Sequence, residues 1–348
     1  MKDRLYFFDN IKVILIFLVV FGHLIEPFIK IQKPYLVIYS IIYIFHMPLF
    51  AFVSGYFSKI PKKKEIYNLV KIFFAFEFIY AITMFLAIYF RPEQMKVLTG
   101  NPGILDSFLD NLFYVLSPIW LLWYILALIS WKLLLKVFKR SPWLIIVAII
   151  MALLVGAIDI PGRALSFQRT FIIFPFFLIG YYVNFDQVMK IKNSIFSKIL
   201  TLLTIAISFY IIPMFVEIGP KMLYFADNYN ELDMTFTTGI ITRSLLLLYV
   251  AMFCISVIVL TSNKKQLYSY IGKHTIGIYL LHGIVIVLFL SLGAVTYLMQ
   301  FNFVVNVIVC ILMSIFICYI FGKEQVTQKI LLITLQKGKK EKDDRIST

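Results

Sequence analysis

The chain has 348 residues, of which 61% are hydrophobic and only 15% are charged, and its mean hydropathy is +0.90. Because about a quarter of the residues in soluble domains are charged, this composition excludes a soluble globular protein. The net charge of +15 does not indicate a nucleic-acid partner, since the basic residues lie in short runs between apolar segments. We therefore expect an all-α polytopic membrane protein.

Ten apolar segments, each about long enough to cross a bilayer, follow one another along the chain. They cover roughly residues 11–29, 35–57, 67–90, 119–138, 142–159, 170–185, 196–217, 239–261, 275–298 and 303–322. With the N-terminus inside, only eight of the 33 lysines and arginines fall on the outer side, namely Lys30, Lys33, Arg91, Lys96, Arg163, Arg169, Lys221 and Arg243. This bias predicts that both termini are cytoplasmic, with a transmembrane domain over residues 1–322 and a basic cytoplasmic tail over residues 323–348.

The first segment carries ionisable residues on one face of the expected helix. Asp9 and Lys12 lie near its predicted cytoplasmic end, and His23 and Glu26 lie about three turns further along the same face. A carboxylate that binds one imidazole nitrogen leaves the other nitrogen free as a base, so His23 and Glu26 are the candidate catalytic residues. The alternative is a buried His–Glu pair that only locks helix packing.

Later segments add polar residues that a membrane span does not need. His46 and Ser54 lie in the second segment, Arg169 opens the sixth, and Tyr279 and His282 lie one turn apart in the ninth. Ionisable groups inside a span indicate function by default. His46 is also consistent with a packing or hydrogen-bonding role, and Arg169 with snorkelling to lipid headgroups.

The tryptophans and cysteines are interpreted as structural residues. Trp120, Trp123 and Trp143 lie near the ends of predicted spans, and we interpret them as an aromatic belt at the membrane interface. The three cysteines lie in apolar runs and behave as small buried hydrophobes. The sequence therefore predicts neither a disulfide framework nor a metal site.

Five stretches along the chain form a series of motifs. They read DNIKVILIFLVVFGHLIEPF, FHMPLFAFVSGYFSK, IWLLWYILALISW, RTFIIFPFFLIGYY and IGKHTIGIYLLHG. In this order they resemble the acyltransferase-3 family, and most of all its fucose 4-O-acetylase-like branch. The resemblance implies an integral-membrane enzyme that moves an acyl group, usually acetyl, from cytoplasmic acyl-coenzyme A to a hydroxyl of a cell-envelope glycan.

The resemblance also implies roles for individual residues. In the family the first helix carries a basic residue, ten intervening positions and then the functional histidine, which here are Lys12 and His23. A lysine there departs from the commoner arginine, since an ammonium binds phosphate as a point charge without bidentate geometry. The residues expected to bind acyl-coenzyme A are Lys12, Asp9, Tyr279 and His282, and those expected to bind the acceptor or the oxyanion are Arg169, His46 and Ser54.

A mechanism follows as a hypothesis. The phosphates of acetyl-coenzyme A would bind at the cytoplasmic lysines, and the pantetheine arm would run along the polar face of the first helix to His23. His23 would then take the proton of the acceptor hydroxyl, or be transiently acylated itself, while Glu26 orients it. The sequence does not decide between these two routes, and it predicts no metal cofactor.

The alternative function is a transporter or exporter of an envelope polysaccharide or its precursor. Transporters tend to show paired halves with broken helices at corresponding positions, and no such pair is visible in the sequence. An enzyme of this kind would have membrane lipid, an envelope glycan acceptor and a downstream envelope-modifying protein as partners. We expect it in the bacterial cytoplasmic membrane.

Overall fold

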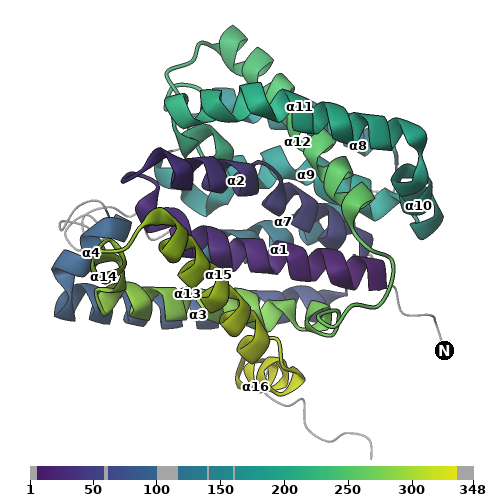
Figure 1. The fold of residues 1–348 in the computed structure, drawn as a ribbon. Coiled ribbons are helices and arrows are strands. Elements are labelled where there is room, and N and C mark those ends of the chain that lie inside the picture. The colour runs from purple at the N-terminus through teal and green to yellow at the C-terminus, as the bar shows by residue number, and fades with distance from the viewer. Residues whose placement is uncertain (1–5, 59–61, 100–116, 139–140, 160, 335–348) are drawn as a thin grey trace, which may run out of the picture.

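The computed structural model describes residues 6–58, 62–99, 117–138, 141–159 and 161–334, and the regular elements in these ranges are all helical (Figure 1). The predicted segments correspond to α1 (Tyr6–Ile25), α2 (Lys33–Tyr56), α3 (Lys63–Phe90), α7 (Trp123–Val137), α8 (Trp143–Leu154), α9 (Phe167–Tyr182), α11 (Ile195–Ile218), α12 (Phe236–Leu260), α13 (Thr275–Ser291) and α15 (Phe303–Phe321). Shorter helices are α4 (Pro92–Thr99), α10 (Phe185–Asn193), α14 (Ala294–Leu298) and α16 (Glu324–Thr334). Short 3-10 turns are η1 (Glu26–Phe28), η2 (Trp120–Leu122), η3 (Val155–Ala157), η4 (Pro161–Ser166), η5 (Pro220–Tyr224) and η6 (Ile271–Lys273).

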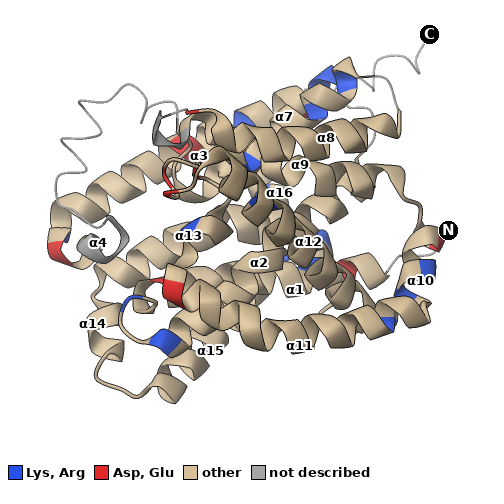
Figure 2. Cartoon of the chain, turned by 90° about the horizontal axis from the view of Figure 1, so that it is seen from above, with Lys and Arg blue, Asp and Glu red and all other residues tan. Residues whose placement is uncertain are grey.

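Helix length and composition agree with a membrane protein. Within the described ranges, eight helical segments are long and apolar enough to cross a membrane. The other two predicted segments form shorter apolar helices, Trp143–Ala157 and Thr275–Ser291. Figure 2 shows charged residues mostly at helix ends and in connecting segments, as expected for helices whose sides face lipid. The chain is thus an all-α, multi-pass membrane protein, and the cytoplasmic location of its termini stays a prediction from the basic residues.

Helix α1 lies at the centre of the bundle. It packs against α2 on one side and against α13 and α15 on the other (Figure 1). In its most apolar stretch 67% of the residues are buried, as in α2, whereas only 22% are buried in α3 and in α11. The polar face of α1 therefore meets protein and not lipid, which is the arrangement that intramembrane ionisable groups require.

The end of α1 that is predicted to be cytoplasmic is anchored by Asn10. Its Nδ2 donates to the carbonyls of Ser262 and Lys264 at 2.8 and 2.9 Å. Its Oδ1 accepts a hydrogen bond from Ser269 Oγ at 2.6 Å. These three bonds tie α1 to the connection between α12 and α13 and so fix the helix that carries His23.

Helices α2 and α9 cross through a pair of glycines. A Cβ atom built on Gly55 would lie 1.9 Å from the carbonyl oxygen of Phe177, and one built on Gly180 would lie 1.9 Å from that of Phe52. The two backbones approach this closely only because both positions lack a side chain, which is the small-residue packing typical of membrane helices. This crossing brings Arg169 on α9 toward the histidine on α2.

Gly180→Ala is therefore expected to destabilise the fold. The added methyl meets backbone and not a flexible side chain, so we expect a loss of about 3 kcal/mol or more, at the upper end of overpacking costs. Thermal unfolding of purified protein in detergent measures it. Gly22→Ala is the matched control, because its Cβ would lie 3.1 Å from a carbon of the Tyr43 ring. Equal unfolding midpoints for the two variants would contradict the proposed role of the glycine crossing.

Two predicted spans end earlier than the hydropathy suggested. The segment predicted over residues 275–298 is divided, because α13 ends at Ser291 and Gly293 adopts a φ of 75° before α14 begins. The segment predicted over residues 170–185 ends at Tyr182, since Asn184 is extended and caps α10 with a capping box. In both places a local backbone signal ends a helix inside a run that hydropathy alone would continue.

The beginning of the predicted tail is ordered. Helix α16 packs against α3 and α13. A Cβ atom on Gly277 of α13 would lie 3.0 Å from Thr327 Oγ1 of α16, so the two helices meet closely. The predicted tail over residues 323–348 therefore starts as a helix, and residues 335–348 lie outside the described residues.

Candidate active site

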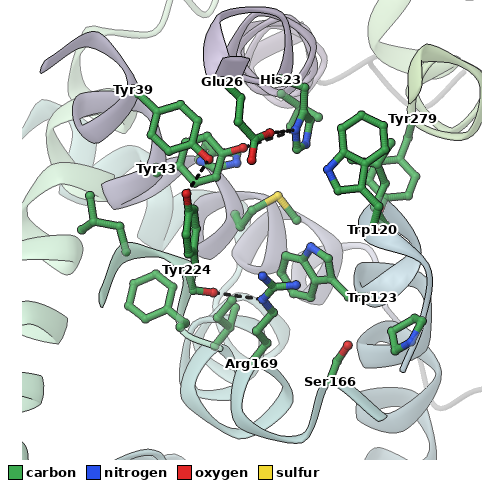
Figure 3. A pocket seen from close by; sticks show the side chains of 18 of the residues that line it. His23, Glu26, Tyr39, Tyr43, Trp120, Trp123, Ser166, Arg169, Tyr224 and Tyr279 are labelled. Carbon is green, nitrogen blue, oxygen red and sulfur yellow. Dashed lines mark hydrogen bonds and ion pairs between the residues drawn. The ribbon is translucent and has the colours of Figure 1, made fainter. Parts of the chain in front are cut away.

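A cavity of about 330 Å³ opens beside α1 (Figure 3). Its walls come from α1, α2 and α9, from the turn that precedes α7, from η5, and from Tyr279 of α13. The lining residues are Val19, His23, Glu26, Tyr39, Tyr43, His46, Met47, Ser117, Pro118, Trp120, Leu121, Trp123, Ser166, Arg169, Ile173, Leu223, Tyr224, Phe225 and Tyr279. Five of the predicted site residues thus meet in one place, and they are His23, Glu26, His46, Arg169 and Tyr279.

His23 and Glu26 contact each other at the end of α1. The helix stops at Ile25, and Glu26 and Pro27 begin the 3-10 turn η1. His23 Nδ1 lies 2.9 Å from Glu26 Oε2. Because a carboxylate only accepts hydrogen bonds, Nδ1 carries the proton of the neutral ring and Nε2 is left with a lone pair. The imidazole is thereby held in the tautomer of a general base.

Two further histidines have the same tautomer. His46 Nδ1 donates to the carbonyl of Ile42 at 2.8 Å, and His282 Nδ1 donates to the carbonyl of Ile278 at 3.0 Å. In each ring Nε2 is therefore the unprotonated nitrogen. His46 lines the cavity, whereas His282 is fully buried behind it with its ring centroid 5.7 Å from that of His23. The Nε2 of His282 has no hydrogen-bond partner among the described residues.

Aromatic side chains form much of the cavity wall. Tyr39 and Tyr43 stack with ring centroids 3.7 Å apart, and the Tyr39 hydroxyl lies 3.4 Å from that of Tyr224. The Trp120 ring meets His23 edge-on, with centroids 5.0 Å apart and an interplanar angle of 70°. Trp120 thus contacts the candidate base directly, and the interpretation of this residue as part of an interfacial belt is incomplete.

Arg169 supplies a cation on the opposite side of the cavity. Its Nε donates to the carbonyl of Tyr224 at 3.0 Å, and its guanidinium lies 4.8 Å from the centroid of the Trp123 ring. In Figure 3 Arg169 and the His23–Glu26 pair point into the same space from opposite walls. Arg169 is therefore held by protein contacts, in contrast to an arginine that snorkels to headgroups.

The backbone around the cavity is strained. Among the described residues, five that are not glycine have a positive φ, and three of these line the cavity: Trp120 at 43°, Ser166 at 53° and Phe225 at 53°. Such conformations cost about 1–3 kcal/mol each and tend to cluster at functional sites. Their concentration here marks the cavity independently of the histidines.

Ser54 lies in a second, smaller cavity. This space of about 160 Å³ lies between α2, α7 and α13, and its lining is mostly apolar. Ser54 Oγ lies 2.8 Å from the Tyr124 hydroxyl. Met47 and Tyr279 line both cavities, so the two spaces are neighbours separated by these side chains. Ser54 does not line the main cavity, and its role toward the acceptor or the oxyanion stays a prediction.

Lys12 and Asp9 lie away from the main cavity. Lys12 Nζ is 3.1 Å from Asp9 Oδ1 and 5.1 Å from the centroid of the Phe57 ring. Ile16, which lies between Lys12 and His23 on the polar face of α1, is fully buried. On this face of α1, Val19, His23 and Glu26 line the main cavity, whereas Asp9, Lys12 and Ile16 line neither of the two cavities.

Several wall residues were missed in the sequence. Tyr39 and Tyr43 were missed, although they follow steps of four and three residues with the predicted His46, which places all three on one face of α2. Glu77 in α3 does not belong to the wall, but it was also missed, although an acid within an apolar run is a signal of function. Tyr224 gave no signal, because only the tertiary fold brings its connection, which is predicted to be outside, onto the site. No group of three His, Cys, Asp or Glu side chains that could hold a metal ion occurs within the described ranges.

The fold and the site thus define a multi-pass helical membrane protein with a cavity in which a histidine is paired with a carboxylate. The profile of the acyltransferase-3 family, described as an acyltransferase domain, matches residues 5–323. The chain belongs to this family and is a membrane acyltransferase. Searches of curated proteins and of solved structures found no significant match.

Proposed function

We propose that the protein transfers an acetyl group from cytoplasmic acetyl-coenzyme A to a hydroxyl of a cell-envelope glycan or glycolipid. The observation that supports this most directly is the His23–Glu26 pair, at 2.9 Å, in a cavity that contains no other carboxylate among its described lining residues. The family membership favours an acyltransferase over an exporter. The bacterial cytoplasmic membrane, and the fucose 4-O-acetylase-like branch, belong to this proposal.

The reaction uses His23 as the base. Its Nε2 takes the proton of the acceptor hydroxyl, and the oxygen attacks the thioester carbonyl to form a tetrahedral intermediate. The carbon–sulfur bond then breaks, and the thiolate of coenzyme A receives the proton from His23. Glu26 stabilises the imidazolium during these steps. Arg169, whose guanidinium points into the cavity, is suited to stabilise the oxyanion. An acyl-histidine, if one forms, would form on the same Nε2.

The donor is expected to enter through the second cavity. Ser54 lies near the end of α2, and Thr275 at the start of α13, on the side predicted to be cytoplasmic. A pantetheine arm in this mostly apolar space would bring its thioester past Met47 and Tyr279 into the main cavity. This proposed route differs from the one along α1 that the sequence suggested, and it is favoured because the second cavity offers open space while Ile16 on the α1 face is fully buried.

The acceptor is expected from the opposite side. Leu223 and Phe225 belong to a connection that is predicted to be outside, and they line the main cavity. Together with Trp123 and Tyr224 they offer flat apolar surfaces of the kind on which sugar rings pack. A downstream envelope-modifying protein would receive the product on this side.

The proposed function is tested with radiolabelled acetyl-coenzyme A. Purified protein in lipid nanodiscs is incubated with the donor and a panel of envelope glycans, and labelled product is measured. We expect transfer to at least one hydroxyl-bearing acceptor. If the labelled donor binds but neither transfer nor acceptor-stimulated hydrolysis occurs with any acceptor, the proposed substrates are wrong.

Leu128→Trp tests the route of the donor. Leu128 of α7 lines the second cavity, and an indole there fills space that the pantetheine arm needs. We expect a rise of about tenfold or more in the Michaelis constant for acetyl-coenzyme A, which corresponds to about 1.4 kcal/mol. Leu133→Trp is the matched control, since Leu133 of the same helix is 45% exposed.

Lys12→Ala distinguishes this route from the one along α1. Because Lys12 is paired with Asp9, we expect lower stability but an unchanged Michaelis constant for the donor. If the Michaelis constant for acetyl-coenzyme A rises in Lys12→Ala and not in Leu128→Trp, the donor binds along the face of α1.

A further inference from the structure

Glu77 is an ionisable residue in a membrane helix with no role in the proposed reaction. It lies near the middle of α3 and does not line the main cavity. Its Oε1 accepts a hydrogen bond from the backbone N–H of Ile119 at 2.8 Å. Its Oε2 is buried and has no hydrogen-bond partner among the described residues. A carboxyl group within a membrane span costs free energy, so its presence here, bonded to Ile119, needs an explanation.

The bond to Ile119 fixes one end of an irregular turn. Ile119 is extended and precedes η2, so the chain is not yet helical at the start of this candidate span. Backbone of this kind is tolerated at membrane depth only where protein satisfies its polar groups. Glu77 satisfies the N–H at the start of the turn, and the Tyr279 hydroxyl donates to the carbonyl of Leu121 near its end. Helices α3 and α13 thus hold the turn from two sides.

The residue held within this turn is Trp120. Its φ of 43° is unfavourable for a side chain of this size, so its surroundings must impose the conformation. The same conformation places its ring edge-on against His23, with the centroids 5.0 Å apart. A continuous chain of contacts therefore runs from Glu77 through the turn and Trp120 to the candidate base.

We propose that Glu77 is a positioning residue for His23, acting through the Ile119–Leu122 turn and Trp120. By holding the turn, it keeps the indole against one side of the imidazole and restricts the ring to the orientation that presents Nε2 to the cavity. The effect on the rate of acyl transfer rests on the proposed function. The effect on the packing of His23 does not, and it is measured separately.

The packing effect is tested by carbethoxylation of His23 with diethyl pyrocarbonate, followed on the purified full chain by peptide mass spectrometry. His23 is only 13% exposed, so displacement of Trp120 uncovers it. Glu77→Ala is expected to raise the modification rate several-fold, approaching that of Trp120→Ala. Glu77→Gln should stay near wild type, because its amide oxygen accepts the same N–H. Thr83→Ala is the control, since Thr83 bonds only within α3 in the described structure, to the carbonyl of Ile79.

The kinetic effect is tested on the same proteins. Glu77→Ala is expected to lower kcat by about 10–100-fold, the cost of a small misplacement of a catalytic group, with an unchanged donor Michaelis constant. The Glu77→Ala, Trp120→Ala double variant should be no slower than Trp120→Ala alone, because both changes interrupt one chain of contacts. Rate losses that multiply would overturn the proposal.

Two outcomes are interpreted separately: a Glu77→Ala protein that does not fold, and a wild-type protein without transfer activity. If Glu77→Ala is not recovered folded, Tyr279→Phe removes the donor at the other end of the turn, and it must raise the carbethoxylation of His23. An unchanged modification rate in the folded variant, whether Glu77→Ala or Tyr279→Phe, would overturn the proposal. If the wild-type protein transfers no acyl group, the proposed function fails, and the carbethoxylation rates still decide the role of Glu77.

Discussion

Replacement of His23 by alanine is expected to lower the rate of acyl transfer by about 10²–10⁴-fold, the contribution of a positioned general base. The Nε2 that it removes is the unprotonated nitrogen beside the cavity, and Glu26 holds it in that form. The fold should survive, because the His23 side chain borders a cavity and its removal enlarges a space that is already present. The measurements are kcat with acetyl-coenzyme A and the thermal unfolding midpoint in the same detergent.

His274→Ala is the matched control for this experiment. His274 precedes α13 and lines neither cavity, so its loss should leave kcat unchanged. A His23→Ala protein that keeps wild-type turnover would remove His23 from the reaction. An unfolding midpoint that falls together with the activity would instead support the packing role that the sequence left open.

The helices of this protein were predictable because their signals are local. Each predicted segment corresponds to a helix, since hydropathy and length suffice to indicate a membrane span. The contact between His23 and Glu26 was also indicated by sequence, because residues three apart on a helix are neighbours. The ends of α9 and α13 were not, since a capping asparagine and a glycine with positive φ end them within apolar runs.

The walls of the site were mostly not predictable, because they depend on contacts between distant segments. Tyr224 contacts Arg169 across 55 positions, and Glu77 binds Ile119 across 42. Neither partner is implied by the periodicity of its own segment. Trp120 shows the problem most clearly, because a tryptophan near the end of a span usually lies at the interface, and only a strained turn inside the bundle brings it to His23.

The positions of the two cavities also change the interpretation of the polar face of α1. In sequence this face runs without a break from Asp9 to Glu26, which indicated a path for the donor. In the structure the two ends of this face have different surroundings. Lys12 and Asp9 form an ion pair at one end, while His23 and Glu26 border open space at the other. The spacing of residues defined the face, but only the structure shows that Ile16 is fully buried on it while Val19, His23 and Glu26 line the main cavity.

Replacement of Glu26 by glutamine is expected to lower kcat by up to about 10⁴-fold, as when the carboxylate of a catalytic triad becomes an amide. The amide keeps the shape of the side chain but carries no charge to stabilise the imidazolium. Its NH₂ group also donates to a deprotonated Nδ1, which moves the ring proton to Nε2 and removes the base. Stability should change little, because Glu26 is only partly buried.

Glu26→Asp separates charge from shape in the same assay. The aspartate keeps the carboxylate but is one methylene shorter than the side chain that reaches Nδ1 at 2.9 Å, so we expect partial activity between that of the wild type and that of Glu26→Gln. The donor Michaelis constant should be unchanged in both variants, because Glu26 does not line the cavity that we assign to the donor. If Glu26→Gln keeps the wild-type kcat, the carboxylate serves packing alone, and His23 acts without a charged partner.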